Sequence, residues 1–261
     1  MKGICNMKSP SLKNHKRRLS LCFILLLILV SKVYANNSIS FATHTTPPLS
    51  LFLQEVLQTA LKPYHKKVTV IEMPGRRVIL QVNQGKVVGD AARAGDFKVI
   101  SNDDTSNYVR VNEAVALTKV VMITRKTSTP EQVSWHELNK GTVAYLSGSK
   151  RLRKNVYDDN RVPVSTSKQA LEMLARERVK SVVMFESTAR NLITNDEHLL
   201  ATLTIQQPLV DRFNLFTFIH KDHAELVPLL EASLKEMKRN GAYQQIADKY
   251  YFSMPLPLSN G

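Results

Sequence analysis

The chain has 261 residues, with 36 Lys and Arg against 22 Asp and Glu, and 43% of its residues are hydrophobic. This composition is ordinary for a globular protein and excludes collagen-like, coiled-coil and mostly disordered chains. Seven of the basic residues lie in the first 35 positions, where there is no acid, so the rest of the chain has 29 basic against 22 acidic residues. A surplus of that size favours the steering of small anions. The sequence lacks the basic stripe interleaved with aromatics that would indicate nucleic-acid binding.

The first 35 residues have the pattern of an export signal. Lys16-Arg17-Arg18 precedes an apolar run at 19–30, and Val33 and Ala35 stand at the two positions of a signal-peptidase site. The run has 12 residues, whereas a helix that spans a bilayer needs about 20. We therefore predict cleavage after Ala35 and a periplasmic protein. The alternative is an uncleaved membrane anchor.

Both cysteines of the chain, Cys5 and Cys22, fall inside the predicted signal 1–35. The mature chain would then have neither a thiol nor a disulfide. A mature chain of about 226 residues can bury enough apolar surface to fold without disulfides.

Strand and helix patterns alternate in the mature chain. We predict strands at 38–43, 68–71 and 87–91, a helix opened by Pro47-Pro48, and a helix at 74–83 stopped by a glycine. This β-α-β-α-β order implies a mainly parallel sheet that is covered by helices.

The second half of the chain begins with a long apolar segment. Residues 113–125 exceed one average strand and carry a polar break at Thr118-Lys119, so they could cross from one lobe to another. Further predicted elements are a helix start at Thr129-Pro130, strands at 142–146, 181–185 and 213–219, a turn at 147–149, a helix capped by Thr166, a helix at 226–237 closed by Asn240-Gly241, and a last helix at 243–252.

Three segments of the chain carry a resemblance to a known family. They read Met-Pro-Gly-Arg-Arg-Val-Ile-Leu-Gln-Val-Asn-Gln-Gly-Lys-Val-Val-Gly-Asp at 73–90, Ala-Leu-Glu-Met-Leu-Ala-Arg-Glu-Arg-Val at 170–179, and Met-Lys-Arg-Asn-Gly-Ala-Tyr-Gln-Gln-Ile-Ala-Asp-Lys-Tyr at 237–250. In this order they resemble the bacterial extracellular solute-binding proteins of family 3, periplasmic receptors related to polar amino-acid binding proteins. The ending Gly-Ala-Tyr-x-x-Ile-x-x-Lys-Tyr is the most specific element.

The resemblance implies an α/β fold of the two-lobed periplasmic-binding-protein type. Two mainly parallel sheets, with helices on both faces, would be joined by two crossing strands. Lobe 1 would comprise 36–118 and 214–261, and lobe 2 would comprise 119–213, with a ligand cleft between them. The sequence departs from the family where Gly-x-x-Asp-Gly has become Gly-Lys-Val-Val-Gly-Asp at 85–90, and where Pro-Pro-Leu-Ser at 47–50 lacks a following aromatic. These departures leave open a ligand other than a standard amino acid.

A cleft that holds a zwitterion needs a cation for its carboxylate and a carboxylate for its ammonium group. Arg93 follows the predicted strand end at Asp90, at the edge where open α/β sheets place their ligands. The alternative is a surface arginine paired with Asp96. Glu186 follows a predicted strand and matches the carboxylate with which the family binds ammonium groups. It could equally serve as an acidic residue in the first turn of the next helix.

Four further residues are candidate ligand contacts. The amides of Gly148 and Ser149 precede a predicted helix and could face an anion, although Gly148 could be only a turn glycine. Arg77 aligns with an arginine that is frequent in the family, and its first-turn position is electrostatically unfavourable for a cation. His44 ends the first predicted strand and could equally be a solvated loop residue.

We expect a binding protein without a cofactor, a metal or an enzymatic activity. Gly-x-Ser-x-Gly, phosphate-loop and His-Glu-x-x-His motifs are absent, and the pair His220 and His223 has no third metal ligand nearby. The expected partners are a small solute and a membrane permease or sensor, with no nucleic acid, and the protein is expected to be a monomer. The competing hypothesis is an exported enzyme, such as the binding half of a cell-wall lyase.

Overall fold

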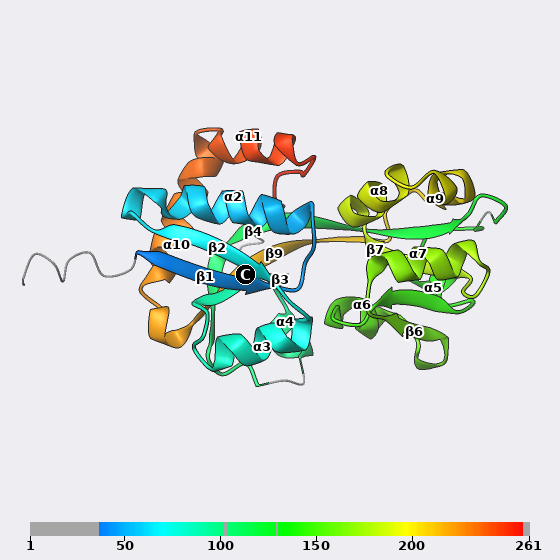
Figure 1. Ribbon diagram of the computed structural model, residues 1–261, viewed down its shortest axis with the longest axis horizontal. Helices are drawn as coiled ribbons and strands as arrows, with labels where there is room; N and C mark the ends of the chain where they lie inside the picture. The colour runs from blue at the N-terminus through cyan, green and yellow to red at the C-terminus, as the bar shows by residue number, and fades with distance from the viewer. Residues whose placement is uncertain (1–36, 102–103, 129, 258–261) are drawn as a thin grey trace, which may run out of the picture. The chain divides into compact units, whose positions relative to one another are not determined.

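A computed structural model describes residues 37–101, 104–128 and 130–257 (Figure 1). The predicted signal at 1–35 and the cleavage after Ala35 lie outside these residues. In the part that is described, no helix combines the length and the apolar character needed to cross a membrane.

The first elements follow the predicted β-α order. They are β1 (Ser38–Thr43), α2 (Leu49–Leu61), β2 (Lys67–Glu72), α3 (Gly75–Asn83), β3 (Gly89–Ala94) and α4 (Phe97–Ile100). Helix α2 begins directly after Pro47-Pro48, and its side chains Leu53, Leu57 and Leu61 at four-residue spacing are fully buried. Strand β3 begins two residues later than predicted and extends through Arg93, which therefore lies within a strand and not past its end.

The middle of the chain adds a second series of helices and strands. They are β4 (Tyr108–Arg125), α5 (Trp135–Leu138), β5 (Val143–Leu146), α6 (Lys150–Asn155), β6 (Arg161–Val164), α7 (Ser167–Ala175), β7 (Ser181–Phe185), α8 (Glu186–Thr194), α9 (Glu197–Thr202) and β8 (Leu203–Ile205). No helix begins at Pro130, and Thr129 lies outside the described residues. Helix α5 begins later because the Ser134 hydroxyl accepts a hydrogen bond from the Glu137 amide at 3.2 Å.

The chain ends with β9 (Asp211–His220), α10 (Leu226–Arg239) and α11 (Ala242–Lys249). Gly241 separates the two helices with φ +84°, a conformation that favours glycine. Helix α11 ends at Lys249 and not at Phe252 as predicted, because Tyr251 adopts φ 60° and interrupts the helical backbone.

The described strands form one nine-stranded sheet in the order β2-β1-β3-β9-β4-β7-β5-β6, with β8 paired to β4. The pairs on either side of the centre are parallel, namely β1 with β2 and β3, and β5 with β6 and β7. Strands β4 and β9 pair with each other in antiparallel register from Tyr108 and His220 to Val120 and Asp211. The predicted α/β class and two-lobed fold are confirmed. Because the two crossing strands pair with each other, the two sheets that were expected form one continuous sheet.

Helices cover both faces of this sheet (Figure 1). Helices α2, α10 and α11 bury their apolar sides against one face of the half that contains β1 to β3, and α3 and α4 cover its other face. In the other half, α7, α8 and α9 pack on the face that carries Ala144 and Val182, while α5 and α6 pack with Val143 and Val183. Neighbouring strand residues thus alternate between two cores, as the period of a strand requires.

We predict that Gly89→Ala destabilises the fold, because a methyl group at this point of β3 would lie 2.2 Å from the Phe218 carbonyl oxygen of β9. Overpacking against backbone should cost about 2–3 kcal/mol, or roughly 5–10 °C in melting temperature. Gly148→Ala is the matched control, since its added methyl would meet no atom closer than 3.7 Å. Equal melting temperatures for the two variants would contradict the close approach of β3 to β9.

Candidate functional site

A cavity of about 990 Å³ lies where the ends of β1, β2 and β5 meet helices α3, α6, α7 and α8; we call it the cleft cavity. Residues before β4 that line it are 44–47, 72–76, Ile79 and Arg93, and residues after β4 are 146–148, Lys150, Arg153, 165–168, Thr188, Asn191 and Leu192. Both halves of the sheet therefore contribute walls, as expected for a ligand site between two lobes.

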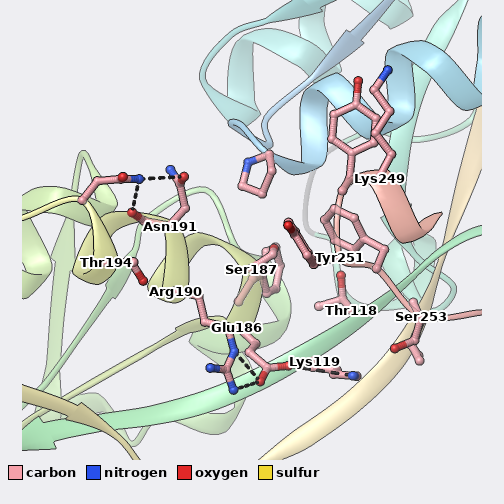
Figure 2. A pocket seen from close by; sticks show the side chains of 16 residues that line it. Thr118, Lys119, Glu186, Ser187, Arg190, Asn191, Thr194, Lys249, Tyr251 and Ser253 are labelled. Atoms are coloured by element: carbon pink, nitrogen blue, oxygen red, sulfur yellow. Dashed lines mark hydrogen bonds and ion pairs between the residues drawn. The ribbon is translucent and has the colours of Figure 1, made fainter. Parts of the chain in front are cut away.

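A second cavity of about 610 Å³ lies against β4, and we call it the β4 cavity (Figure 2). It is lined by Pro48, 117–119, 185–187, Arg190, Asn191, Thr194, Asn195 and 249–253. Apart from Asn191, its lining residues differ from those of the cleft cavity.

Arg93 reaches the cleft cavity because β3 carries a β-bulge. The register with β9 shifts between Asp90 and Arg93, so that these two residues, three apart, can meet. Arg93 Nε lies 2.5 Å from Asp90 Oδ2, and its Nη2 donates to the Gly75 carbonyl at 3.1 Å. Arg93 is only 3% exposed and Asp90 is 0% exposed. Arg93 is therefore neither a surface arginine nor free to face a ligand alone; it is one half of a buried ion pair.

The alternative partner of Arg93, Asp96, is engaged elsewhere. Arg151 of α6 donates to Asp96 Oδ2 at 3.0 Å and to Asp211 Oδ2 at 3.2 Å. Its guanidinium also lies over the Phe213 ring, 4.2 Å from the centroid. This cluster links α6 to the loop after β3 and to β9, and so joins the two halves of the sheet beside the cleft cavity.

His44 follows β1 directly and lines the cleft cavity. Its Nδ1 atom is buried and has no hydrogen-bond partner among the described residues. Burial, and then the nearby Arg93 guanidinium, hold the pKa of His44 well below its usual range. The imidazole is therefore neutral at pH 7, with one nitrogen that can donate and one that can accept.

The turn at 147–149 is largely satisfied within the protein. The amides of Ser147 and Ser149 donate to the carbonyls of Val164 and Leu146, each at 3.0 Å. The Ser149 hydroxyl caps α6 by accepting from the Leu152 amide at 3.5 Å. The expected pair of amides for an anion is thus reduced to that of Gly148, because the Ser149 amide N–H is in use.

Gly148 lies in a turn, which the Ser149 amide closes by donating to the Leu146 carbonyl. The φ angle of Gly148 is not positive, so this turn does not require a glycine. Gly75 at the start of α3 packs directly against Gly148. A methyl group on Gly75 would lie 3.3 Å from the Gly148 carbonyl oxygen and 3.6 Å from His44 Cβ. Gly75 therefore allows backbone from the two halves of the sheet to touch at the cleft cavity, whereas a methyl group on Gly148 would meet no atom closer than 3.7 Å.

Glu186 lines the β4 cavity and not the cleft cavity (Figure 2). It is the first residue of α8, so Arg190 lies one turn later and donates to its carboxylate from Nη2 at 2.7 Å and Nε at 3.0 Å. Lys119 Nζ of β4 lies 3.9 Å from the same carboxylate. The structure does not bring Arg93 and Glu186 to one cavity.

The arginine pair at the start of α3 is divided by the helix. Arg76 lines the cleft cavity, and Arg77 lines neither cavity. Consecutive helical residues point about 100° apart, which allows Arg76 to face the cleft cavity while Arg77 does not. Sequence reasoning also missed Lys150, Arg153 and Lys168, although each lies in the first turns of a helix that follows a strand.

No family model matches the chain, and no curated protein matches it. Solved structures do match in fold. A histidine kinase sensor domain with similarity to periplasmic binding proteins has a TM-score of 0.70 at 15% identity, over 82% of this chain and 96% of that chain. An ancestral arginine-binding protein bound to arginine has a TM-score of 0.69 at 17% identity, over 84% and 100%.

The substrate-binding protein of an amino acid ABC transporter also matches, with a TM-score of 0.64 at 14% identity, over 82% of this chain and 99% of that chain. At such identities the likeness shows the fold. The resemblance to solute-binding proteins of family 3 that the sequence indicates is therefore confirmed at the level of the fold.

We predict that Arg93→Ala destabilises the ligand-free protein by about 3–5 kcal/mol, because it leaves Asp90 buried without its counter-ion. The double variant Asp90→Asn/Arg93→Gln should be less destabilised than the sum of Asp90→Asn and Arg93→Gln, by 1 kcal/mol or more, since it removes both charges. Urea unfolding of the wild type, these two single variants and the double variant measures this coupling. Additive losses would show that the two side chains do not interact.

We predict that His44 makes stability dependent on pH. Its pKa is lowered in the folded state, so below about pH 6.5 the unfolded state binds more protons than the folded state. Folding stability therefore decreases as the pH is lowered. The loss from this residue should reach up to about 1.4 kcal/mol per pH unit. In urea unfolding at pH 7 and 5.5, His44→Gln should lose less stability than the wild type, whereas the exposed control His198→Gln should match the wild type.

Proposed function

We propose that the chain is a solute-binding protein that captures a small polar solute in the cleft cavity. The observation that carries this proposal is the cavity itself, because its volume of about 990 Å³ suits a small ligand and both halves of the sheet line it. Polar side chains such as His44, Arg76 and Thr166 reach it from separate elements. A ligand that touches both halves favours the state in which they are together.

We further propose that the two halves are lobes 36–118 with 214–261, and 119–213, which turn about β4 and β9. Binding would then close the cleft by a hinge where the two paired strands pass from one half to the other, near 118–120 of β4 and 211–214 of β9. The Arg151 cluster with Asp96 and Asp211 would stabilise the closed state.

The proposed place of action is the periplasm, and the proposed partner is an ABC-type importer or a membrane sensor. The export pattern at 1–35 supports the compartment. The fold is compatible with both partners, because the matched structures include a substrate-binding protein of a transporter and a sensor domain. We propose a monomer without a cofactor or an enzymatic activity. Turnover of a bound compound by the purified protein would favour the alternative, an exported enzyme such as the binding half of a cell-wall lyase.

The proposal is tested by a thermal-shift screen of the mature protein against amino acids, polyamines, carboxylates and phosphates. One-site binding at a hundredfold excess over the dissociation constant should stabilise the fold by about 2.7 kcal/mol. For a chain of this size the melting temperature should rise by roughly 5–10 °C. A screen without a single shift, repeated by calorimetry with the same result, would contradict a solute-binding role.

We predict that Arg76→Ala weakens binding of the identified solute at least tenfold, because Arg76 lines the cleft cavity. Arg77→Ala should leave the affinity within about twofold of the wild type. Both residues are exposed, adjacent and in the first turn of α3, so the two variants change net charge and helix propensity equally. Calorimetry measures both affinities. A larger loss for Arg77→Ala would favour the placement expected from the family resemblance over that of the structure.

A further inference from the structure

The cleft cavity has a strong excess of positive charge. Among the described residues that line it, Glu72 is the acidic side chain. The cationic side chains come from α3, β3, α6 and α7, and they are Arg76, Arg93, Lys150, Arg153 and Lys168. Asp90 neutralises Arg93, so the excess comes from the other four. Like charges that converge on a shared space repel one another, and an anion in that space relieves the repulsion.

Of the carboxylates Glu72, Asp90 and Glu186, the last two are paired with cations. Glu72 Oε1 accepts a hydrogen bond from the Ser50 hydroxyl at 2.5 Å. Asp90 is fully buried against Arg93, and Glu186 lines the β4 cavity, where Arg190 and Lys119 neutralise it. An ammonium group in the cleft cavity would therefore meet Glu72 amid an excess of cations.

Arg76, Arg153 and Lys168 have no side-chain hydrogen bond or ion pair with any other described residue, and all three are exposed. Arg76 belongs to the half of the sheet before β4, and the other two belong to the half after it. The cations that are available to a ligand thus come from both walls. Helices α3 and α7 also begin at the cavity, and their N-terminal dipoles add to the positive potential.

We propose that the solute is a small anion with at least two negative groups, carboxylate or phosphate, and without an ammonium group. This inference rests on the proposed function, since it names the class of solute that the same cavity takes. One anionic group contacts Arg76 and another contacts Arg153, so that charge neutralisation occurs when both walls reach the ligand. The absence of an aromatic after Pro47-Pro48 agrees with a ligand other than a standard amino acid.

Calorimetry with defined probes tests the class of solute. Succinate, citrate and pyrophosphate are the anionic probes, and glutamine, arginine and putrescine carry ammonium groups. We expect one-site binding of at least one anion, with an affinity at least tenfold above that of each ammonium compound. The carboxylates and pyrophosphate form separate arms, so the preferred arm identifies the anionic group.

A pair of charge-reversal variants tests the position of the anion. Arg153→Glu should weaken binding of the preferred anion at least tenfold, because it places a like charge on the cavity wall. Lys154→Glu should change it by less than about threefold, since this neighbour on α6 lines neither cavity. The two variants have the same net charge, so general electrostatic steering affects them equally.

Each other outcome overturns a defined part of the account. Tighter binding of an ammonium compound than of every anion would overturn the anionic class and leave the proposed function standing. Equal losses for Arg153→Glu and Lys154→Glu would show that the anion is not held in the cleft cavity. Failure of all three anions to bind, with a shift from another solute in the thermal-shift screen, would contradict the anionic class alone. The absence of any shift in that screen would contradict the proposed function.

Discussion

The hydrogen-bonded pairing of β4 with β9 is the constraint on which the rest of the structure depends. These strands lie at the centre of the nine-stranded sheet, and they carry the chain between its two halves. Strand β4 alone extends over 18 residues, and its segment 114–124 is buried except at Lys119. Because both halves are anchored on the same two strands, loops that are far apart in the sequence meet above them. The cleft cavity is a consequence of that arrangement.

Local irregularities then turn this meeting point into a candidate site. The bulge in β3 allows Arg93 to pair with Asp90, and the bond from Arg93 to the Gly75 carbonyl fixes the start of α3. Gly75 in turn contacts Gly148 from the other half. A buried ion pair of this kind contributes little net stability, but removal of either partner strongly destabilises the fold. It therefore acts as a positioning element for the cavity wall, and the cations exposed on the wall remain available to a solute.

The fold was largely predictable from the sequence, because the apolar spacing of helices such as α2 and α10 and the apolar runs of β4 and β9 are local signals. Short elements were missed where the signal is a single cap, as at α5. Helix α9 and strand β8 were not predicted either, since they are brief and carry little periodicity.

The candidate site was predictable only in part. The rule that ligands lie at strand ends brings His44, Arg93 and Gly148 to the cleft cavity. It does not bring Glu186 there, because Arg190 of the same helix and Lys119 of β4 hold its carboxylate at the β4 cavity, and the second contact joins segments distant in sequence. It also cannot show that Arg93 is neutralised by Asp90, since their meeting depends on a bulge.

A crystal structure of the protein with its preferred solute tests the central claim most directly, because it locates the solute without reference to any variant. The account predicts density in the cleft cavity, with anionic oxygens within about 3 Å of the guanidinium groups of Arg76 and Arg153. Density in the β4 cavity beside Glu186, with the cleft cavity filled by solvent, would contradict it.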